Sequence, residues 1–419
     1  MKNKKSFWGG VLSGALGVAL VACGIYLGSS LWNFLGLYGA QETAVSESAD
    51  EGSVATQETL NKIGVLEETI DKYYLEGADE ETLENGVYKG LVEALGDPYS
   101  TYYSPEELAE VEDKTEGIYY GIGAYIGIDA DTSLPKLTGI IEGTPAQESG
   151  LRAGDLLYKV DGEEVQGMEL TQVTSLVKGE EGTTVHLTII RDGEADYLEI
   201  DVERRKVESP TVNQEMLDER IGYIQITEFD TVTLDQFTEA LAVCRGQGME
   251  GLILDLRGNP GGNLVTVCDI ARQILPKGLI VYTEDKEGNR TEYSCDGDKE
   301  MKEELVVLVD GGSASASEIL AGAIKDYGIG TLVGTTTFGK GIVQRIISLT
   351  DGSAVKLTVS HYFTPNGNDI HEVGIEPNEE VAFDADAYYN DNVDNQLNRA
   401  IEIMNEKLGE AETEEGTEN

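Results

Sequence analysis

A serine-rich turn and a glycine-flanked lysine are the residues of this 419-residue chain best suited to covalent chemistry. The turn reads Gly-Ser-Ala-Ser-Ala-Ser-Glu over residues 312–318, and Lys340 stands in a Phe-Gly-Lys-Gly sequence. A serine hydroxyl becomes a useful nucleophile when a base removes its proton during the attack, and a neutral lysine can be that base. Its ordinary pKa of about 10.4 must then fall toward ~7–8, which burial in apolar surroundings can achieve. Phe338, Ile342 and Val343 are placed to supply such surroundings.

Other catalytic motifs fit the chain less well. The chain has three histidines, and none lies near a Gly-x-Ser-x-Gly nucleophile turn. Ser175 and Lys178 match a Ser-x-x-Lys signature, but the companion motifs of that enzyme class do not follow it. Three cysteines lie beyond the N-terminal segment at no metal-like spacing, and we interpret them as buried apolar side chains: Cys244, Cys268 and Cys295. The sequence therefore predicts neither a metal nor a cofactor.

Strands that alternate with helices must position the serine and the lysine. Residues 252–257 and 305–309 are nearly all apolar, as in strands buried on both faces, and a helical pattern follows each of them. This order predicts an α/β core with a largely parallel sheet, whose sites form at the carboxyl ends of the strands. The turn at 257–262 and the serine-rich turn both follow such ends. A serine at the start of helix 315–327 would face free N–H groups that favour negative charge.

Residues 117–203 change to a pattern of short strands and turns, and their order resembles a bacterial PDZ domain. The resemblance rests on Thr144-Pro145-Ala146, on Ser149 to Asp155 and on Val160-Asp161-Gly162. A PDZ domain binds a C-terminal peptide as an added strand and holds its carboxylate with backbone N–H groups of a glycine-rich loop. By resemblance, the residues that bind the peptide carboxylate would be Gly121, Ile122, Gly123 and Ala124.

These motifs in this order resemble the carboxy-terminal processing proteases, or tail-specific proteases, from about residue 60 to 405. The resemblance implies a Ser-Lys dyad with Ser315 as nucleophile, Lys340 as general base and Gln344 as the residue that orients the lysine. It further implies that the oxyanion is bound by the N–H groups of Gly261 and Ala316. Asp326 would have a supporting role.

Neighbouring polar residues receive structural interpretations. We expect Ser313 to cap the helix and Ser317 to pack or hydrogen-bond locally. His371 lies near a stretch that resembles the family's Thr-Pro-x-Gly sequence, and we interpret it as a surface or substrate-proximal residue.

The N-terminus combines a basic start with a long uncharged stretch. Lys2, Lys4 and Lys5 precede residues 7–38, which are long enough to span a bilayer. The lysines would stay in the cytoplasm, so the rest of the chain would face outward. A lipoprotein anchored at Cys23 and a cleaved signal peptide are the alternatives.

Net charge narrows the possible partners. The formal net charge of −48 excludes nucleic acid as a partner, because phosphate binding needs clustered lysine and arginine. The expected partners are protein or peptide substrates with accessible C-terminal tails, and the membrane through the N-terminus. A homo-oligomer is possible.

The predicted organisation is a membrane-anchored multidomain α/β protein with an inserted β-rich PDZ-like domain. The predicted parts are a transmembrane signal-anchor at 1–40, an acidic linker at 41–59, a helical segment at 60–115, the PDZ-like domain at 116–204, the Ser-Lys peptidase core at 205–408 and an acidic disordered tail at 409–419. The predicted function is a membrane-anchored serine endopeptidase that binds C-terminal tails and cuts them through an acyl-enzyme. An inert tail-binding scaffold and a non-peptidase hydrolase on the same dyad are the competing interpretations.

Overall fold

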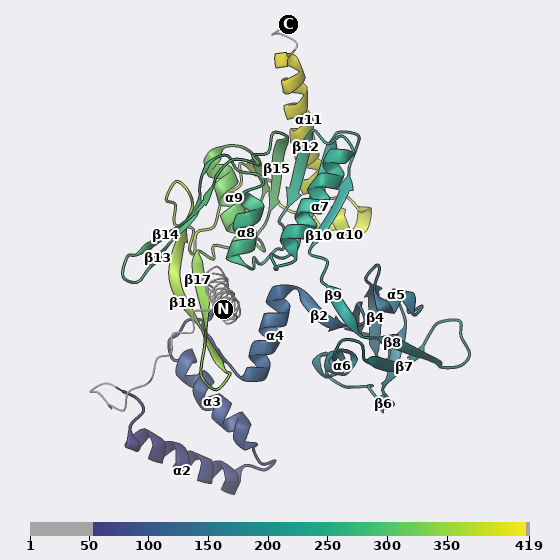
Figure 1. The fold of residues 1–419 in the computed structure, drawn as a ribbon, viewed down its shortest axis with the longest axis vertical. Coiled ribbons are helices and arrows are strands. Elements are labelled where there is room, and N and C mark those ends of the chain that lie inside the picture. The colour runs from purple at the N-terminus through teal and green to yellow at the C-terminus, as the bar shows by residue number, and fades with distance from the viewer. Residues whose placement is uncertain (1–52, 416–419) are drawn as a thin grey trace, which may run out of the picture. The chain divides into compact units, whose positions relative to one another are not determined.

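The computed structural model describes residues 53–415, so the predicted anchor and Cys23 lie outside the described residues. The chain divides into two compact units, one made of the residues up to Pro105 with Arg345–Leu357, and one made of Glu106–Gln344 with the residues from Thr358 onward. Figure 1 colours the described chain from purple near the N-terminus to yellow near the C-terminus. No helix within residues 53–415 is long and apolar enough to cross a membrane.

Two helices and a strand pair make up the first unit. Helix α2 (Gln57–Tyr73) starts at Thr56, whose side chain accepts a hydrogen bond from the N–H of Thr59, and α3 (Glu80–Glu93) starts in the same way at Asp79. These N-caps satisfy backbone donors that the first turn of a helix leaves free. Strand β1 (Thr101–Tyr103) pairs antiparallel with the first residues of β18 (Ala354–Phe363).

The second unit begins at Glu106, the second residue of helix α4 (Pro105–Glu116), and continues into a β-rich domain. Strands β2 (Ile118–Gly121) and β9 (Arg205–Glu208) form a two-stranded ribbon where the chain enters and leaves that domain. Its main sheet has the order β3-β4-β5-β7-β8, with β6 paired to β5, so β3 is an edge strand. The remaining elements are β3 (Ala124–Ile128), β4 (Pro135–Ile140), α5 (Pro145–Glu148), β5 (Leu156–Val160), β6 (Glu163–Glu164), α6 (Leu170–Val177), β7 (Thr184–Ile190) and β8 (Leu198–Glu203).

A six-stranded sheet forms the centre of the α/β core, in the order β10-β11-β12-β15-β16-β19. The pairs from β11 to β19 are parallel and only β10 runs antiparallel, which confirms the predicted largely parallel sheet. The strands are β10 (Val212–Met216), β11 (Ile221–Ile226), β12 (Gly251–Asp255), β15 (Glu304–Val309), β16 (Thr331–Gly334) and β19 (Glu379–Glu380).

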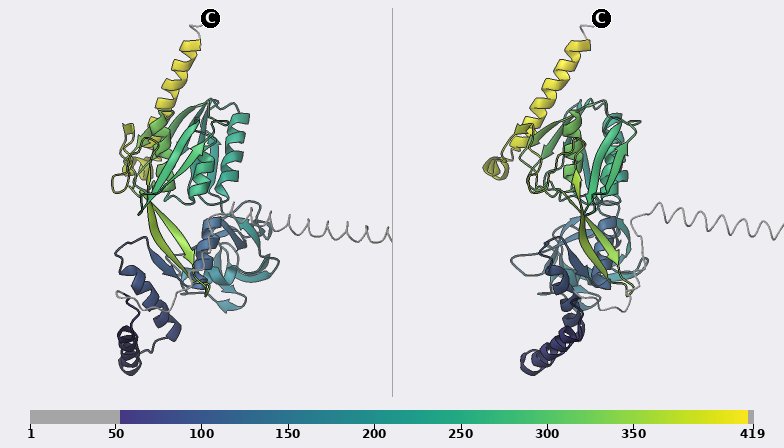
Figure 2. Two further views of the ribbon diagram at one scale, coloured as in Figure 1. Left: turned by 60° about the vertical axis from the view of Figure 1, so that its left-hand side comes forward. Right: turned by 90° about the vertical axis from the view of Figure 1, so that its left-hand side faces the viewer.

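Helices cover both faces of this sheet, as Figures 1 and 2 show. Alternate residues of each central strand point to opposite faces. Leu252 and Leu254 of β12 join a core built with α7 (Thr233–Gly246), α8 (Leu264–Ala271) and α9 (Ala316–Tyr327). Ile253, between them, joins a second core with Ala400 and Met404 of α11 (Asn395–Glu415). This two-sided burial explains why β12 and β15 are almost entirely apolar.

Two hairpins and the last helices complete the core. Strand β13 (Gly278–Asp285) pairs with β14 (Arg290–Cys295) and with the later residues of β18, while β17 (Ile342–Ser348) pairs with β18. Helix α10 (Ala385–Asp391) precedes α11. Because α11 continues to Glu415, most of the stretch predicted as a disordered tail is helical. Its alanine and glutamate residues are good helix formers, which outweighs the acidity that suggested disorder.

Candidate active site

Ser315 lies at the start of α9 in a backbone conformation that residues other than glycine rarely adopt. Its φ of 52° and ψ of −111° differ from both the helix and the strand region. Three hydrogen bonds hold this conformation at the Ser315 carbonyl, from the N–H groups of Glu318 and Ile319 and from the hydroxyl of Tyr362. Ser315 is half-buried, so its side chain stays accessible at the helix N-terminus. This is the setting that the sequence predicted for a nucleophile.

Ser313 and Ser317 are fully buried and hydrogen-bonded to backbone carbonyl groups. The hydroxyl of Ser313 donates to Leu256 O at 2.7 Å, and that of Ser317 donates to Asn259 O at 3.0 Å. Both therefore fasten the serine-rich turn to the chain that follows β12. Of the three serines, only Ser315 is exposed enough to meet a substrate.

Glu318 joins the nucleophile segment to the lysine segment, although its side chain is fully buried. One carboxylate oxygen accepts hydrogen bonds from Ser315 N and Lys340 N, both at 2.9 Å. The other accepts from Thr337 Oγ1 at 2.6 Å and from Gly339 N at 2.7 Å. A single carboxylate thus fixes the backbone of both predicted dyad residues. Sequence reasoning gave Glu318 no role, although its position three residues after a helix-starting serine is a capping-box signal.

Lys340 is half-buried at the end of the loop that leads into β17. Of the flanking residues expected to form its apolar surroundings, Ile342 is buried, whereas Phe338 is 55% exposed. Gln344, on β17, has a buried Nε2 that finds no hydrogen-bond partner within residues 53–415. A neutral lysine amine has a lone pair that such a donor could satisfy, so the predicted orienting role of Gln344 stays chemically reasonable.

The hydroxyl of Tyr362 is buried beneath the nucleophile. It donates to Ser315 O at 2.9 Å, and burial raises the pKa of this hydroxyl well above its ordinary value. Tyr362 N also donates to Gly341 O at 3.0 Å, so one residue of β18 contacts both the serine turn and the lysine loop. The sequence carried no signal for this role.

Replacing Tyr362 by phenylalanine should lower kcat about 3- to 10-fold and leave KM for a peptide substrate nearly unchanged. The strained Ser315 backbone loses one of its three restraints, and a neutral hydrogen bond contributes about 0.5–1.5 kcal/mol. Steady-state kinetics of the two proteins test this. Tyr389→Phe is the matched control because Tyr389 is 79% exposed. Equal kcat for wild type and Tyr362→Phe would contradict the assigned role.

The turn after β12 lies directly against Ser315. A Cβ atom on Gly261 would come within 2.7 Å of Ser315 Cβ and 2.9 Å of Ala316 N, so only glycine permits this approach. The N–H of Gly261, however, already donates to Asn259 Oδ1 at 2.8 Å. In this conformation Gly261 allows the turn to pack closely on Ser315. The N–H groups of Ala316 and of the exposed Gly262 donate no hydrogen bond within residues 53–415. Those two are the donors left for an oxyanion.

A buried ionic cluster anchors the same turn. Arg257 donates to the fully buried Asp255 at 2.6 Å and to Asp394 at 2.9 Å, just before α11 begins. Tyr223 OH donates to Asp255 as well, at 2.7 Å. Burial opposes the charge of Arg257, but these carboxylates raise its pKa above the ordinary value. The cluster holds the base of the turn, and its pairing with a residue 137 positions away could not be read from the sequence.

Asp326 lies on α9, and His371 lies against Gly341, next to Lys340. Asp326 accepts a hydrogen bond from Asn366 N at 2.8 Å, so it fastens the loop after β18 to α9. His371 follows that loop and packs on Gly341, where a Cβ would come within 2.6 Å of His371 N. Its Nδ1 is buried and has no hydrogen-bond partner within the described chain. Asp326 thus holds the loop after β18, and His371 lies beside the lysine loop.

The predicted carboxylate-binding loop joins β2 to the edge strand β3. Ile122 and Gly123 donate no backbone hydrogen bond within the described part of the chain, so their N–H groups are available to a ligand. Gly123 has a φ of 82°, and a Cβ there would overlap the Thr144 side chain at 2.3 Å. The loop is held from behind, because Thr144 Oγ1 donates to Gly123 O and Ala146 N donates to Ile122 O.

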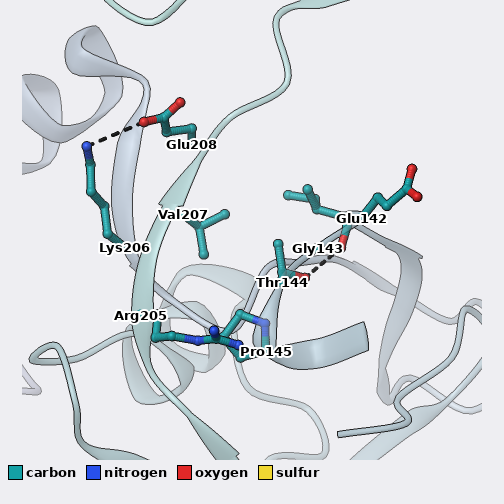
Figure 3. Close-up of a pocket in the computed structure, with 9 residues that line it drawn as sticks. Glu142, Gly143, Thr144, Pro145, Arg205, Lys206, Val207 and Glu208 are labelled. Atoms are coloured by element: carbon teal, nitrogen blue, oxygen red, sulfur yellow. Dashed lines mark hydrogen bonds and ion pairs between the residues drawn. The ribbon is translucent and has the colours of Figure 1, made fainter. Parts of the chain in front are cut away.

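Figure 3 shows a cleft lined in part by Thr144, the residue whose side chain packs on Gly123. It lies between the loop around Thr144 and strand β9, where Arg205 forms an ion pair with Glu148. The cleft is therefore separate from the free edge of β3, where a peptide strand would add. Its lining residues are Ile141, Glu142, Gly143, Thr144, Pro145, Arg205, Lys206, Val207 and Glu208.

Comparison with known proteins assigns the three parts of the chain. The peptidase family S41 model matches residues 220–381, a PDZ domain model matches residues 137–191, and the model of the activating protease CtpB N-terminal domain matches residues 18–107. The first and second of these ranges contain the Ser315 site and most of the β-rich domain.

Individual relatives agree with these models. The chain is 35% identical to the carboxy-terminal processing protease CtpA of Bacillus subtilis over 76% of its own length and 68% of the relative's. It is 33% identical to CtpB of the same organism over 84% of its length and 73% of the relative's. The solved structure of the photosystem II D1 C-terminal processing protease is 32% identical, with a TM-score of 0.45, over 76% of this chain and 86% of that one. The chain therefore belongs to the S41 family of carboxy-terminal processing proteases, serine peptidases that carry a PDZ domain.

Proposed function

We propose that this peptidase is anchored in the cell membrane, faces outward, captures the C-terminal tails of protein substrates in its PDZ domain and cuts them with Ser315 and Lys340. The observation that carries the catalytic part is the Glu318 carboxylate, which binds the backbone of both residues. The tail-binding part rests on an unpaired strand edge beside free loop N–H groups.

The proposed reaction proceeds through an acyl-enzyme. Neutral Lys340 takes the proton from Ser315 Oγ as this oxygen attacks the scissile carbonyl carbon, and the negative charge moves to the carbonyl oxygen. The N–H groups of Ala316 and Gly262 would stabilise that oxyanion, together with the N-terminus of α9. Lys340 then gives its proton to the leaving amine, and the ester on Ser315 is released by a water molecule that Lys340 deprotonates in turn.

A matched pair of peptides tests the role of the tail. Both peptides carry the same sequence with an apolar C-terminal residue, and one ends in a free carboxylate while the other ends in an amide. The free acid should have a KM at least about tenfold lower, because N–H groups bind a charged carboxylate more strongly than a neutral amide oxygen. Equal KM values for the two peptides would refute tail recognition and leave the peptidase assignment intact.

Substituting Gly123 by alanine should abolish tail binding and spare the reactivity of Ser315. The added methyl would overlap Thr144, and alanine does not favour a φ of 82°, so the carboxylate loop must move. Fluorescence anisotropy of a labelled tail peptide should show at least about 30-fold weaker binding. Labelling of Ser315 by a small fluorophosphonate should be unchanged. Gly143→Ala is the control, because open space surrounds that glycine although its φ is also positive.

The membrane anchor is proposed from residues 7–38, which carry no charge and follow three lysines. In intact cells, a protease added outside should digest the described domains of the anchored protein. Carbonate extraction should leave them in the membrane fraction. Replacing Cys23 by serine should not release the protein, whereas release would favour a lipid anchor at Cys23 and overturn the transmembrane proposal.

A further inference from the structure

The segment after β11 is hydrogen-bonded to the active-site turn on one side and to helix α4 on the other. Phe229 N donates to Gly261 O at 2.9 Å, and Asn263 N donates back to Phe229 O at 2.7 Å. Thr231 N donates to Thr115 O, near the end of α4, at 3.2 Å. A movement of α4 would therefore be transmitted to the turn that faces Ser315.

Gly117 is the point at which α4 ends and the chain enters the PDZ domain. It has a φ of 68°, and its carbonyl accepts a hydrogen bond from Ser209 N, where the chain leaves the domain. The entry and exit strands are thus tied together at this glycine. A Cβ on Gly117 would lie 2.9 Å from Asp230 Cβ and 3.0 Å from Asp230 Oδ2. The carboxyl group of Asp230 therefore packs directly on the base of the PDZ domain.

Asp230 is a buried acidic residue, 5% exposed, whose side chain accepts no hydrogen bond within residues 53–415. Two charged side chains reach it: Glu228 from its own segment and Lys114 from α4, which lie 3.9 Å from each other. Val232 and Thr233, at the start of α7, are the uncharged neighbours: Thr233 Oγ1 accepts a hydrogen bond from Asp230 N, and Val232 lies beside Asp230 at Gly117. Burial and, to a lesser extent, Glu228 raise the pKa of Asp230 to about 7, against the effect of Lys114.

We propose that Asp230 is a positioning residue whose uncharged carboxyl group closes the contact at Gly117 and so holds the turn at Gly261 in place for attack by Ser315. Ionisation puts a second negative charge beside Glu228 into this contact and loosens it. The turn then loses part of its support through Phe229. The inference concerns the peptidase reaction itself and does not depend on whether a tail occupies the PDZ domain.

The pH dependence of kcat in the full-length chain tests the proposal, with fluorescently labelled β-casein as the probe substrate. Wild type and Asp230→Asn are compared from about pH 5.5 to 9, because asparagine keeps the size of the side chain and cannot ionise. The ratio of the variant's kcat to that of wild type should rise about three- to tenfold with increasing pH, with a midpoint near pH 7. Titration of Lys340 affects both proteins and cancels in the ratio. The KM ratio should stay flat.

Two neighbouring substitutions test whether Asp230 is the group that titrates. Glu228→Gln removes a like charge. When Asp230→Asn is compared with Asp230 in proteins that carry Glu228→Gln, the midpoint of the kcat ratio should therefore move to lower pH. Lys114→Gln removes the opposite charge, so in proteins that carry this substitution the midpoint of the same kcat ratio should move to higher pH. Asp235→Asn is the matched control, because Asp235 is exposed on α7, and its kcat ratio to wild type should not vary with pH.

The outcomes separate clearly. A kcat ratio for Asp230→Asn that stays constant across the pH range would overturn the proposal, as would a ratio that falls with rising pH. Midpoints that do not respond in opposite directions to Glu228→Gln and Lys114→Gln would show that another group titrates. If the amidated and free-acid peptides behave alike while the Asp230 titration is seen, tail recognition fails and the present proposal stands.

Discussion

Replacing Ser315 by alanine or Lys340 by arginine should each reduce kcat by about 10⁴- to 10⁶-fold, because the nucleophile and its base act as one unit. Arginine keeps the positive charge and most of the length of lysine but cannot be deprotonated at any accessible pH, so it cannot accept the Ser315 proton. The double variant should be no slower than either single variant. Steady-state cleavage of a tail-bearing peptide measures all three.

Controls separate lost chemistry from lost structure. Ser294→Ala and Lys286→Arg change exposed residues of the same types and should retain full activity. Ser317→Ala removes a buried hydrogen bond to Asn259 O, so it should lower the melting temperature and reduce kcat far less than Ser315→Ala. Full-length Ser315→Ala should bind the tail peptide as tightly as wild type. Substantial turnover by either dyad variant would refute the proposed dyad.

The sequence predicted best those elements whose burial pattern is local. Strand β15 and helix α9 each begin within one residue of the predicted start, because a run of apolar residues and a helical apolar spacing report directly on burial. The all-apolar β12 was correctly expected to be buried on both sides. The helical start after Ser315 also follows from local capping chemistry. These features need no knowledge of distant residues.

What the sequence could not show depends on contacts between distant residues. Glu318 binds a loop 22 residues away, and Arg257 binds Asp394 across 137 positions. Phe338 was expected to form apolar surroundings for Lys340, yet it is 55% exposed, because apolar type alone does not set the burial of a loop side chain. Gly261 was taken as an oxyanion donor from resemblance, and only coordinates reveal that Asn259 already accepts its N–H. Such assignments require the fold first.

The second large effect is expected at Glu318. In Glu318→Gln one carboxylate oxygen becomes an NH₂ group, and each oxygen of the glutamate accepts two hydrogen bonds. Whichever way the amide turns, its NH₂ group faces two buried donors and cannot accept their hydrogen bonds. An unsatisfied buried group costs about 1–3 kcal/mol, so the free energy of unfolding should fall by roughly 2–6 kcal/mol. The backbones of Ser315 and Lys340 lose their common acceptor, and kcat should fall about 10²- to 10³-fold.

A graded series distinguishes positioning from general destabilisation. Thr337→Val removes one of the four donors to Glu318 and leaves the carboxylate in place, so kcat should fall only a few-fold. Glu376→Gln, the same substitution at an exposed glutamate, should change neither kcat nor stability. Kinetics are measured well below the melting temperature of each variant, which keeps the unfolded fraction small.

Two measurements on the same variant separate a positioning role from a purely structural one: the labelling rate of Ser315 and the affinity for a tail peptide. In Glu318→Gln, fluorophosphonate labelling of Ser315 should slow in proportion to kcat. The affinity for a tail peptide should stay that of wild type, because the carboxylate loop at Ile122 and Gly123 packs on a hydrophobic core separate from that of α9. If labelling and kcat were unchanged while stability fell, Glu318 would be a structural residue only. The coordinated loss of labelling and turnover is expected because one carboxylate fixes both ends of the dyad.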